Sequence, residues 1–217
     1  MNDSPAITVH EQFDDLAQQR ESANLGMWVF LGTELMFFGG IFLGFTVYRL
    51  SYPRAFAEAA GHLDLVAGSI NTFVLLTSSF LFSIAISTFQ ARQRALTLVL
   101  LTFTVLLGLA FLGIKGFEYQ EDWEHGFVPG PAFTHPGPDH DHVQLFFVLY
   151  FIATGLHALH LLIGVILTLV LMGLAVRSWF RPDREVAIGV FGLYWHFVDF
   201  IWMFIFPLFY LLGGSSS

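Results

Sequence analysis

Ionisable side chains inside long apolar stretches are the residues of this sequence best suited to chemistry. They are Glu34, His157, His160, His196 and Asp199. Charged groups in hydrocarbon cost ~2.5–3.5 kcal/mol each on insertion scales, so they normally turn inward and pair. His157 and His160, and likewise His196 and Asp199, stand three residues apart, which puts each pair on one face of a helix. Two helices therefore each present a polar pair.

These side chains allow three interpretations. Imidazole and carboxylate groups are suitable ligands for a two-metal site in a helical bundle, although the repeated Glu-x-x-His motifs of that class are absent. Intramembrane carboxylates also mark proton or ion pathways. The third interpretation is an interhelical hydrogen-bond network that fixes the packing of the helices. We predict this network, without a metal ion or a catalytic residue in the chain. Its predicted members are Glu34, Asn71, His157, His160, His196 and Asp199.

Composition assigns the chain to the membrane class. Of its 217 residues, 55% are hydrophobic and 12% are charged, which is outside the usual range of a soluble domain. A bilayer core of ~30 Å requires ~20 apolar residues per spanning helix. Five runs meet this requirement, at residues 25–48, 65–89, 95–116, 143–176 and 186–212. The sequence therefore predicts an all-α polytopic membrane bundle with five transmembrane helices in one domain, residues 25–212, followed by a flexible tail, residues 213–217.

Basic residues predict the orientation of this bundle, because they concentrate on the cytoplasmic side of a membrane. One side carries Arg20, Arg92, Arg94, Arg177, Arg181 and Arg184, and the other carries Arg49, Arg54 and Lys115. We therefore predict a cytoplasmic N-terminal segment, residues 1–24, and an external C-terminus. The external loop, residues 117–142, is acidic and contains four histidines. It is interpreted as a solvated loop, with a docking surface for a basic electron donor or a weak metal site as alternatives.

The same composition excludes some classes of partner and site and favours others. The absence of cysteine excludes disulfides, thiolate metal sites and iron–sulfur clusters. A net charge of −8 without a basic cluster argues against nucleic acid as a partner. Arg177, Trp179 and Arg181 have the composition of an anchor beside anionic lipid headgroups, so we predict that they bind lipid. The alternative is that the two arginines only set the orientation.

Four motifs resemble the subunit III family of haem-copper oxidases and occur in that family's order. They are YWHFVD at residues 194–199, TGLHALH at 154–160, NTFVLLTSS at 71–79 and GTE at 32–34. The resemblance covers residues 25–212. The chain is similar to the last five of the seven helices of the larger members, without the pair that forms one wall of their lipid cleft. Ala158 replaces a glycine of the family motif.

The resemblance implies a noncatalytic subunit of a proton-translocating terminal oxidase, which reduces dioxygen to water. Haem and copper then belong to the catalytic subunit I, and this chain holds none. It would contact subunit I directly, with subunit II and a small subunit IV as further partners. In the bacterial inner membrane it would bind phospholipids and sustain proton uptake and turnover.

The electron donor to the complex is a separate question. Cytochrome c is predicted, because an acidic outer loop suits a basic carrier electrostatically. The alternatives are subunit III of a quinol oxidase and an accessory membrane subunit of a nitric oxide reductase. An independent small transporter is a remote further alternative, since no internal repeat supports the inverted-repeat plan.

Overall fold

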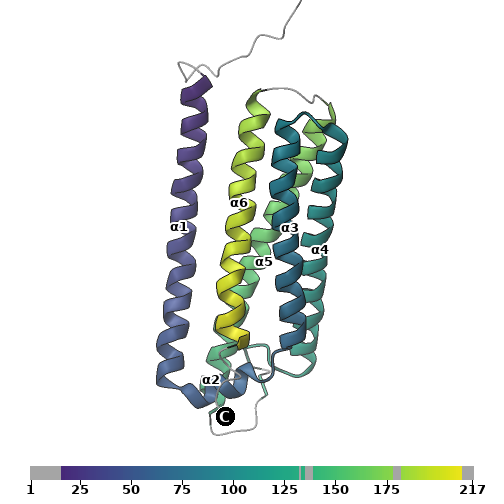
Figure 1. The fold of residues 1–217 in the computed structure, drawn as a ribbon. Coiled ribbons are helices and arrows are strands. Elements are labelled where there is room, and N and C mark those ends of the chain that lie inside the picture. The colour runs from purple at the N-terminus through teal and green to yellow at the C-terminus, as the bar shows by residue number, and fades with distance from the viewer. Residues whose placement is uncertain (1–15, 132, 135–138, 178–181, 212–217) are drawn as a thin grey trace, which may run out of the picture.

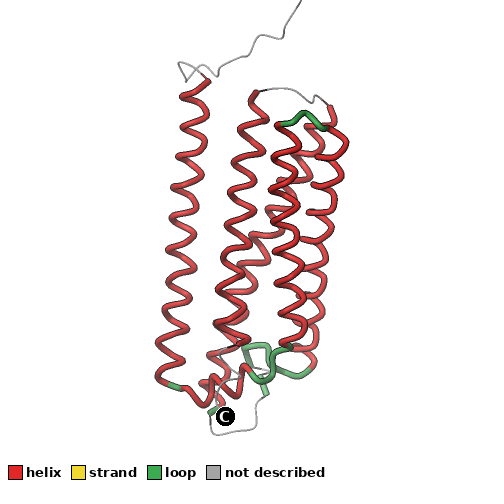
Figure 2. The backbone as a smooth tube through the Cα atoms, in the orientation of Figure 1, coloured by secondary structure: helices red, strands yellow, loops and turns green. Residues whose placement is uncertain are grey.

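The computed structural model describes residues 16–131, 133–134, 139–177 and 182–211, and every regular element in these ranges is helical (Figure 2). The elements are α1 (Leu16–Ser51), α2 (Pro53–Ala60), α3 (Leu65–Gln90), α4 (Arg94–Glu124), α5 (His140–Arg177), α6 (Pro182–Phe206) and a π-helical turn, η1 (Pro207–Leu211). Five of these helices are long and apolar enough to cross a membrane. The predicted all-α membrane bundle with five spanning helices is confirmed.

The bundle has a compact part and a helix that stands beside it. Helices α3, α4, α5 and α6 pack together, whereas α1 runs along one side and approaches α6 and α5 (Figure 1). The chain enters α1 at one end of the bundle and leaves α6 at the other (Figure 1). The first and last described helices therefore begin and end at opposite ends of the bundle, while the cytoplasmic location of the N-terminus stays a prediction.

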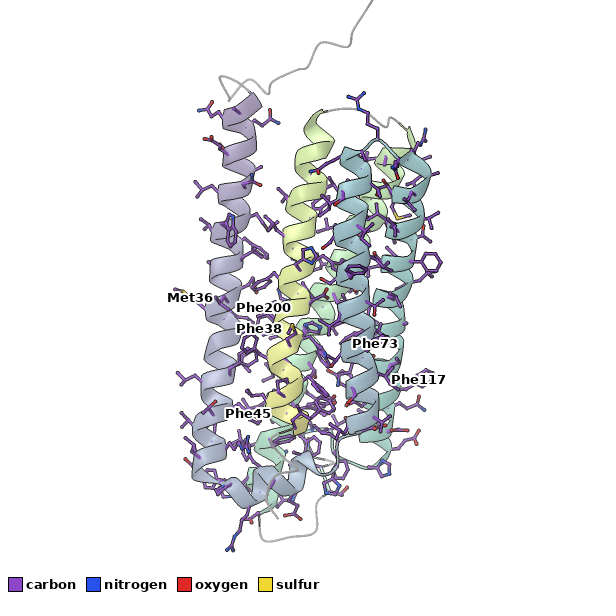
Figure 3. All side chains as sticks on the ribbon, viewed as in Figure 1. Met36, Phe38, Phe45, Phe73, Phe117 and Phe200 are labelled. Carbon is purple, nitrogen blue, oxygen red and sulfur yellow. The ribbon has the colours of Figure 1, made fainter. Side chains whose placement is uncertain are left out.

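One line of side chains attaches α1 to the rest. Leu31, Phe38 and Phe45, each seven residues apart, are its buried hydrophobic residues in the described range. Phe38 and Phe45 point toward α6 in Figure 3, and Met36 points away and is 82% exposed. A helix with seven-residue spacing of buried positions contacts its neighbours along a narrow stripe. Most of the apolar surface of α1 is therefore left for lipid or another protein.

The outer loop is shorter than predicted, and the prediction that it covers residues 117–142 was wrong. Helix α4 continues to Glu124 and α5 begins at His140. Charged residues in this segment were interpreted as solvated loop, but Glu118 and Asp122 are buried on one face of α4, together with Lys115 just before them. Residues three and four apart lie on the same helical face, so the charges could pair inside the protein without ending the helix.

Two further differences concern a longer α1 and an additional short helix. The described part of α1 already starts at Leu16, so the helix includes polar residues before the predicted start at residue 25. Helix α2 was not predicted. Proline at its first position suits a helix start, and its buried face of Ala55, Phe56, Ala59 and Ala60 packs against the bundle. The predicted tail, residues 213–217, lies outside the described residues.

Trp195 of α6 occupies the centre of the compact part. Its indole is 1% exposed, and it lies against Gly108 of α4 and Gly164 of α5. A Cβ atom added to these glycines would stand 3.1 and 3.3 Å from the ring. The indole Nε1 donates to Ser78 Oγ of α3 at 3.2 Å. A single side chain thus joins four helices, and two of the close approaches depend on glycine.

Candidate functional site

Glu34 and His160 connect α1 to α5. Glu34 Oε2 lies 3.1 Å from His160 Nε2, and both side chains are mostly buried. The other ring nitrogen, Nδ1, donates to the carbonyl oxygen of Leu156 at 2.8 Å, so Nε2 is the atom that shares a proton with the carboxyl group. Tyr194 OH donates to the His160 carbonyl oxygen at 2.9 Å. The residues selected from sequence thus form a polar contact between two helices.

His196 of α6 makes a second polar contact, in this case with α3. Its Nδ1 lies 2.6 Å from Ser79 Oγ, and its Nε2 lies 3.1 Å from Ser83 Oγ. A neutral imidazole has one donor and one acceptor nitrogen, so one serine donates while the other accepts. Both ring nitrogens are satisfied by this arrangement. Two serines four residues apart on an apolar helix were the signal in the sequence.

The remaining members of the predicted network stay apart. His157, Asn71 and Asp199 are buried, and their polar side-chain atoms have no hydrogen-bond partner among the described residues. His157 instead packs between the rings of Phe111 and Trp202, with centroid distances of 5.4 and 5.1 Å. The Ser79 hydroxyl lies near Asp199, but Ser79 forms its hydrogen bond with His196. Of the six predicted members of the interhelical network, only Glu34 and His160 contact each other in this way, because side chains at similar depth point from their helices in different directions.

A buried ion pair that sequence reasoning missed lies between α4, α5 and η1. Lys115 Nζ is 3.1 Å from Glu118 Oε2, and it donates to Tyr150 OH at 2.7 Å and to Tyr210 OH at 2.6 Å. Tyr150 OH in turn donates to Glu118 Oε1 at 2.6 Å, and Tyr210 OH donates to the same oxygen. All four side chains are at least 95% buried. The spacing of Lys115 and Glu118 at the end of an apolar run was the available signal.

The π-helical turn explains how Tyr210 reaches this pair. Proline cannot donate a backbone hydrogen bond, so the α-helical pattern of α6 ends at Phe206 and the wider turn begins at Pro207. Phe209 and Tyr210 of this turn are buried in the bundle. This turn directs the Tyr210 hydroxyl to Glu118.

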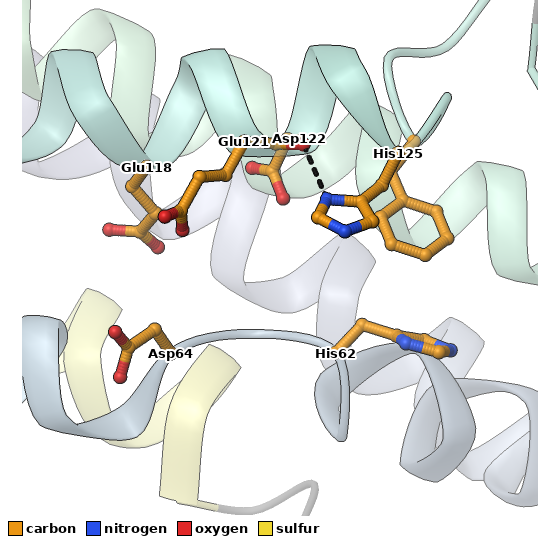
Figure 4. Close-up of a pocket in the computed structure, with 7 residues that line it drawn as sticks. His62, Asp64, Glu118, Glu121, Asp122 and His125 are labelled. Carbon is orange, nitrogen blue, oxygen red and sulfur yellow. Dashed lines mark hydrogen bonds between the residues drawn. The ribbon is translucent and has the colours of Figure 1, made fainter.

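A cavity of about 320 Å³ opens beside the ion pair at the C-terminal end of α4. Figure 4 shows its acidic and imidazole side chains facing one another across the gap between α4 and the α2–α3 connection. Its lining consists of His62, Asp64, Glu118, Glu121, Asp122, His125 and Phe127. His125 Nδ1 donates to the Glu121 carbonyl oxygen at 2.7 Å. Two of the four histidines placed in the predicted outer loop, His140 and His142, belong instead to the first turn of α5.

The buried groups include histidine and carboxylate side chains, which are potential metal ligands. In the part of the chain that the structure describes, no three His, Cys, Asp or Glu side chains are grouped closely enough to hold a metal ion. The predicted lipid site lies outside the described part of the chain: this holds for Trp179, Arg181 and the side chain of Arg177.

The Glu34 contact gives a testable expectation. Glu34→Gln should reach the membrane at nearly the wild-type level, because its amide can still hydrogen-bond His160 Nε2. Glu34→Lys places a cation beside the same imidazole and should lower the membrane level, since an inserted charge costs ~2.5–3.5 kcal/mol. Quantitative immunoblotting of membranes measures both variants. Equal levels for Gln and Lys would contradict a specific pairing role.

Comparison with known proteins bears on this arrangement of paired polar groups in an apolar bundle. A protein named "Heme-copper oxidase subunit I+III" from Aeropyrum pernix is 30% identical over 199 residues, covering 89% of this chain and 23% of that protein. This chain thus spans about a quarter of that relative's length. "Probable quinol oxidase subunit 3" of Staphylococcus saprophyticus is 28% identical over 94% of this chain and 96% of that protein. The protein of the same name from Staphylococcus aureus strain USA300 is 26% identical over the same shares.

A family model described as "Cytochrome c oxidase subunit III" matches residues 12–214. The matched range includes the four motifs and the five spanning helices. The chain therefore belongs to the subunit III family of haem-copper oxidases.

Proposed function

We propose that this chain is a noncatalytic subunit III of a proton-translocating terminal oxidase, one that supports the complex without holding haem or copper. The observation that carries the proposal is that several ionisable groups inside the helices are paired with other side chains of this chain. Glu34 pairs with His160, His196 with two serines, and Lys115 with Glu118. The first two contacts each join two helices, and the Lys115–Glu118 pair on α4 is linked to α5 and η1 through two tyrosine hydroxyls. Each group is thus committed to a protein partner, which supports a role in packing rather than in redox chemistry.

The direct partner in this proposal is the catalytic subunit I. A relative carries the names of subunits I and III in one polypeptide, which favours direct contact between the two. The exposed apolar surface of α1 and the other spanning helices suits a neighbour of this kind, and lipid would cover the remainder. Subunit II and a small subunit IV are further proposed partners. The proposed location is the bacterial inner (cell) membrane, in keeping with the bacterial origin of the Staphylococcus relatives.

Cytochrome c and quinol remain two candidate electron donors to the complex. The argument for cytochrome c was the acidic outer loop, and it is weakened because Glu118 and Asp122 are buried on α4. The argument for quinol is the name of the Staphylococcus relatives, which match this chain over nearly their whole length. Oxygen uptake by the purified complex with reduced cytochrome c and with a soluble quinol decides between them. An accessory role in nitric oxide reduction predicts nitric oxide consumption instead.

Deleting the gene should leave the redox centres of the complex intact while lowering sustained turnover. The expected haem and copper content per complex is unchanged, because this chain is proposed to supply no ligand. The initial rate should be close to that of the wild type, and the rate after many turnovers should fall. Pigment spectra, metal analysis and prolonged oxygen uptake measure these quantities, and a complemented strain is the control.

Two results would overturn parts of this proposal. Stoichiometric loss of haem or copper would show that the chain contributes a redox ligand. An intact spectrum with unchanged prolonged turnover would remove the role in sustaining activity. Solute transport by the purified chain alone in liposomes would favour an independent transporter.

A further inference from the structure

The cavity at the C-terminal end of α4, called here the outer cavity, has more carboxyl groups in its lining than cationic groups of the chain to pair with them. Four of its lining residues carry carboxyl groups, and Lys115, the buried lysine behind them, is paired with one of these, Glu118. A second, Asp64, uses Oδ1 to accept from the backbone N–H groups of Val66 and Ala67 as the N-cap of α3. Glu121 and Asp122 add two further carboxyl groups at the same opening. The electrostatic preference of this cavity is therefore for a cation.

Asp122 points to a ligand rather than to a solvated acidic surface. The residue is 6% exposed, and its Oδ2 atom is buried without a hydrogen-bond partner. Its carboxyl group is directed toward the space between α4 and the α2–α3 connection (Figure 4). A buried carboxylate oxygen without a donor is costly, so a hydrogen-bonding cation in this space would satisfy it.

The shape and the lining favour an organic cation over a bare metal ion. The cavity volume of about 320 Å³ lies at the small end of ligand pockets, which measure ~300–1,000 Å³. Phe127 stacks with His125 and contacts the His62 ring, at centroid distances of 6.1 and 4.7 Å, so one side of the cavity is aromatic. Aromatic faces attract ammonium and guanidinium groups. No three metal-ligating side chains converge there among the described residues.

The position of the cavity relates it to the membrane surface. Trp123, next to Asp122 in the chain, is 72% exposed near the end of α4, where the apolar helix meets the outer connections. Tryptophan concentrates at the headgroup level of bilayers. The opening is therefore accessible both to soluble amines and to the amine of a lipid headgroup.

We propose that this cavity binds a primary ammonium or guanidinium group, which donates hydrogen bonds to Asp122 and lies against the ring of Phe127. The shared chemistry is a cation that carries N–H donors. Its source is either a lipid headgroup or a soluble amine.

The test uses the purified full chain with its copurifying subunits in a neutral detergent. Ethanolamine is titrated while the thermal unfolding midpoint is recorded, and choline, which has no N–H donor, is the matched ligand. Ethanolamine should raise the midpoint and choline should have little effect. Asp122→Asn should weaken ethanolamine about tenfold or more, as expected for the loss of a charge-assisted hydrogen bond. Glu121→Gln, at the rim, should weaken it less and serves as a second variant if Asp122→Asn folds poorly.

Glu124→Gln is the control variant, because Glu124 is an exposed carboxylate on the same end of α4 that does not line the cavity. It should bind ethanolamine like the wild type. Nanodiscs with phosphatidylethanolamine or phosphatidylcholine of identical acyl chains, analysed by native mass spectrometry, separate the two sources. Preferential retention of phosphatidylethanolamine that Asp122→Asn abolishes identifies a lipid headgroup, and stabilisation by ethanolamine without that preference identifies a soluble amine.

Three results would overturn the proposal. One is equal stabilisation by ethanolamine and choline. Another is an ethanolamine response that neither Asp122→Asn nor Glu121→Gln changes. The third is tight Zn²⁺ binding that His125→Ala abolishes, together with no response to ethanolamine, which would make the cavity a metal site.

Discussion

Glu118→Ala should be among the most destabilising single substitutions in this chain. It removes the carboxylate that faces the Lys115 ammonium at 3.1 Å and accepts from two tyrosine hydroxyls. Lys115 would then be a buried cation without a counter-ion, since its side chain is 3% exposed. Removing one partner of a buried ion pair typically costs ~3–5 kcal/mol. Unfolding by sodium dodecyl sulfate, followed by circular dichroism in mixed micelles, measures the change in the free energy of unfolding.

The double variant Lys115→Met with Glu118→Leu separates charge from packing. It removes both charges and keeps apolar volume, so it should be clearly more stable than Glu118→Ala. Glu124→Gln removes an exposed carboxylate of the same helix and should change the free energy of unfolding little. A double variant no more stable than Glu118→Ala would show that the site depends on packing rather than on the pairing of charge.

Trp195→Ala should produce the second large loss of stability. The indole is seated between Gly108 and Gly164, and its Nε1 donates to Ser78. Truncation leaves a cavity at the junction of four helices and deprives the Ser78 hydroxyl of its donor. Loss of a buried tryptophan side chain typically costs ~3–5 kcal/mol. The same unfolding titration should therefore detect it as a large shift of the midpoint.

Trp123→Ala is the matched control for this substitution. Trp123 is 72% exposed on α4, so its truncation removes an aromatic ring of the same kind without opening the core. Its free energy of unfolding should stay close to that of the wild type. Equal losses in the free energy of unfolding for the two tryptophans would show that the buried position of Trp195 among four helices contributes no additional stability.

The polar pairs were only partly accessible to sequence reasoning. Glu34 and His160 were selected because an ionisable group in an apolar run requires a partner, and they contact each other. His157 was selected for the same reason, but it lies between aromatic rings. Spacing along a helix tells which residues share a face. It does not tell which neighbouring helix that face meets, because this depends on the rotation of each helix in the bundle.

The charged end of α4 was interpreted incorrectly for a related reason. Lys115, Glu118 and Asp122 look like the start of a solvated loop, because charges normally leave the membrane. They stay helical and buried because Tyr150 of α5 and Tyr210 of η1 supply hydroxyl groups from distant parts of the chain. The helix boundary thus depends on partners that local sequence does not contain.

The sequence by itself determined the membrane class, the five spanning helices and the family motifs, since apolar run length and residue spacing are local properties that the bilayer requires. Only the tertiary structure decided which polar groups pair, where α4 ends and that an acidic cavity opens beside the α2–α3 connection. These features arise when helices distant in the chain pack at particular rotations, and each then offers its side chains to partners that no local pattern specifies.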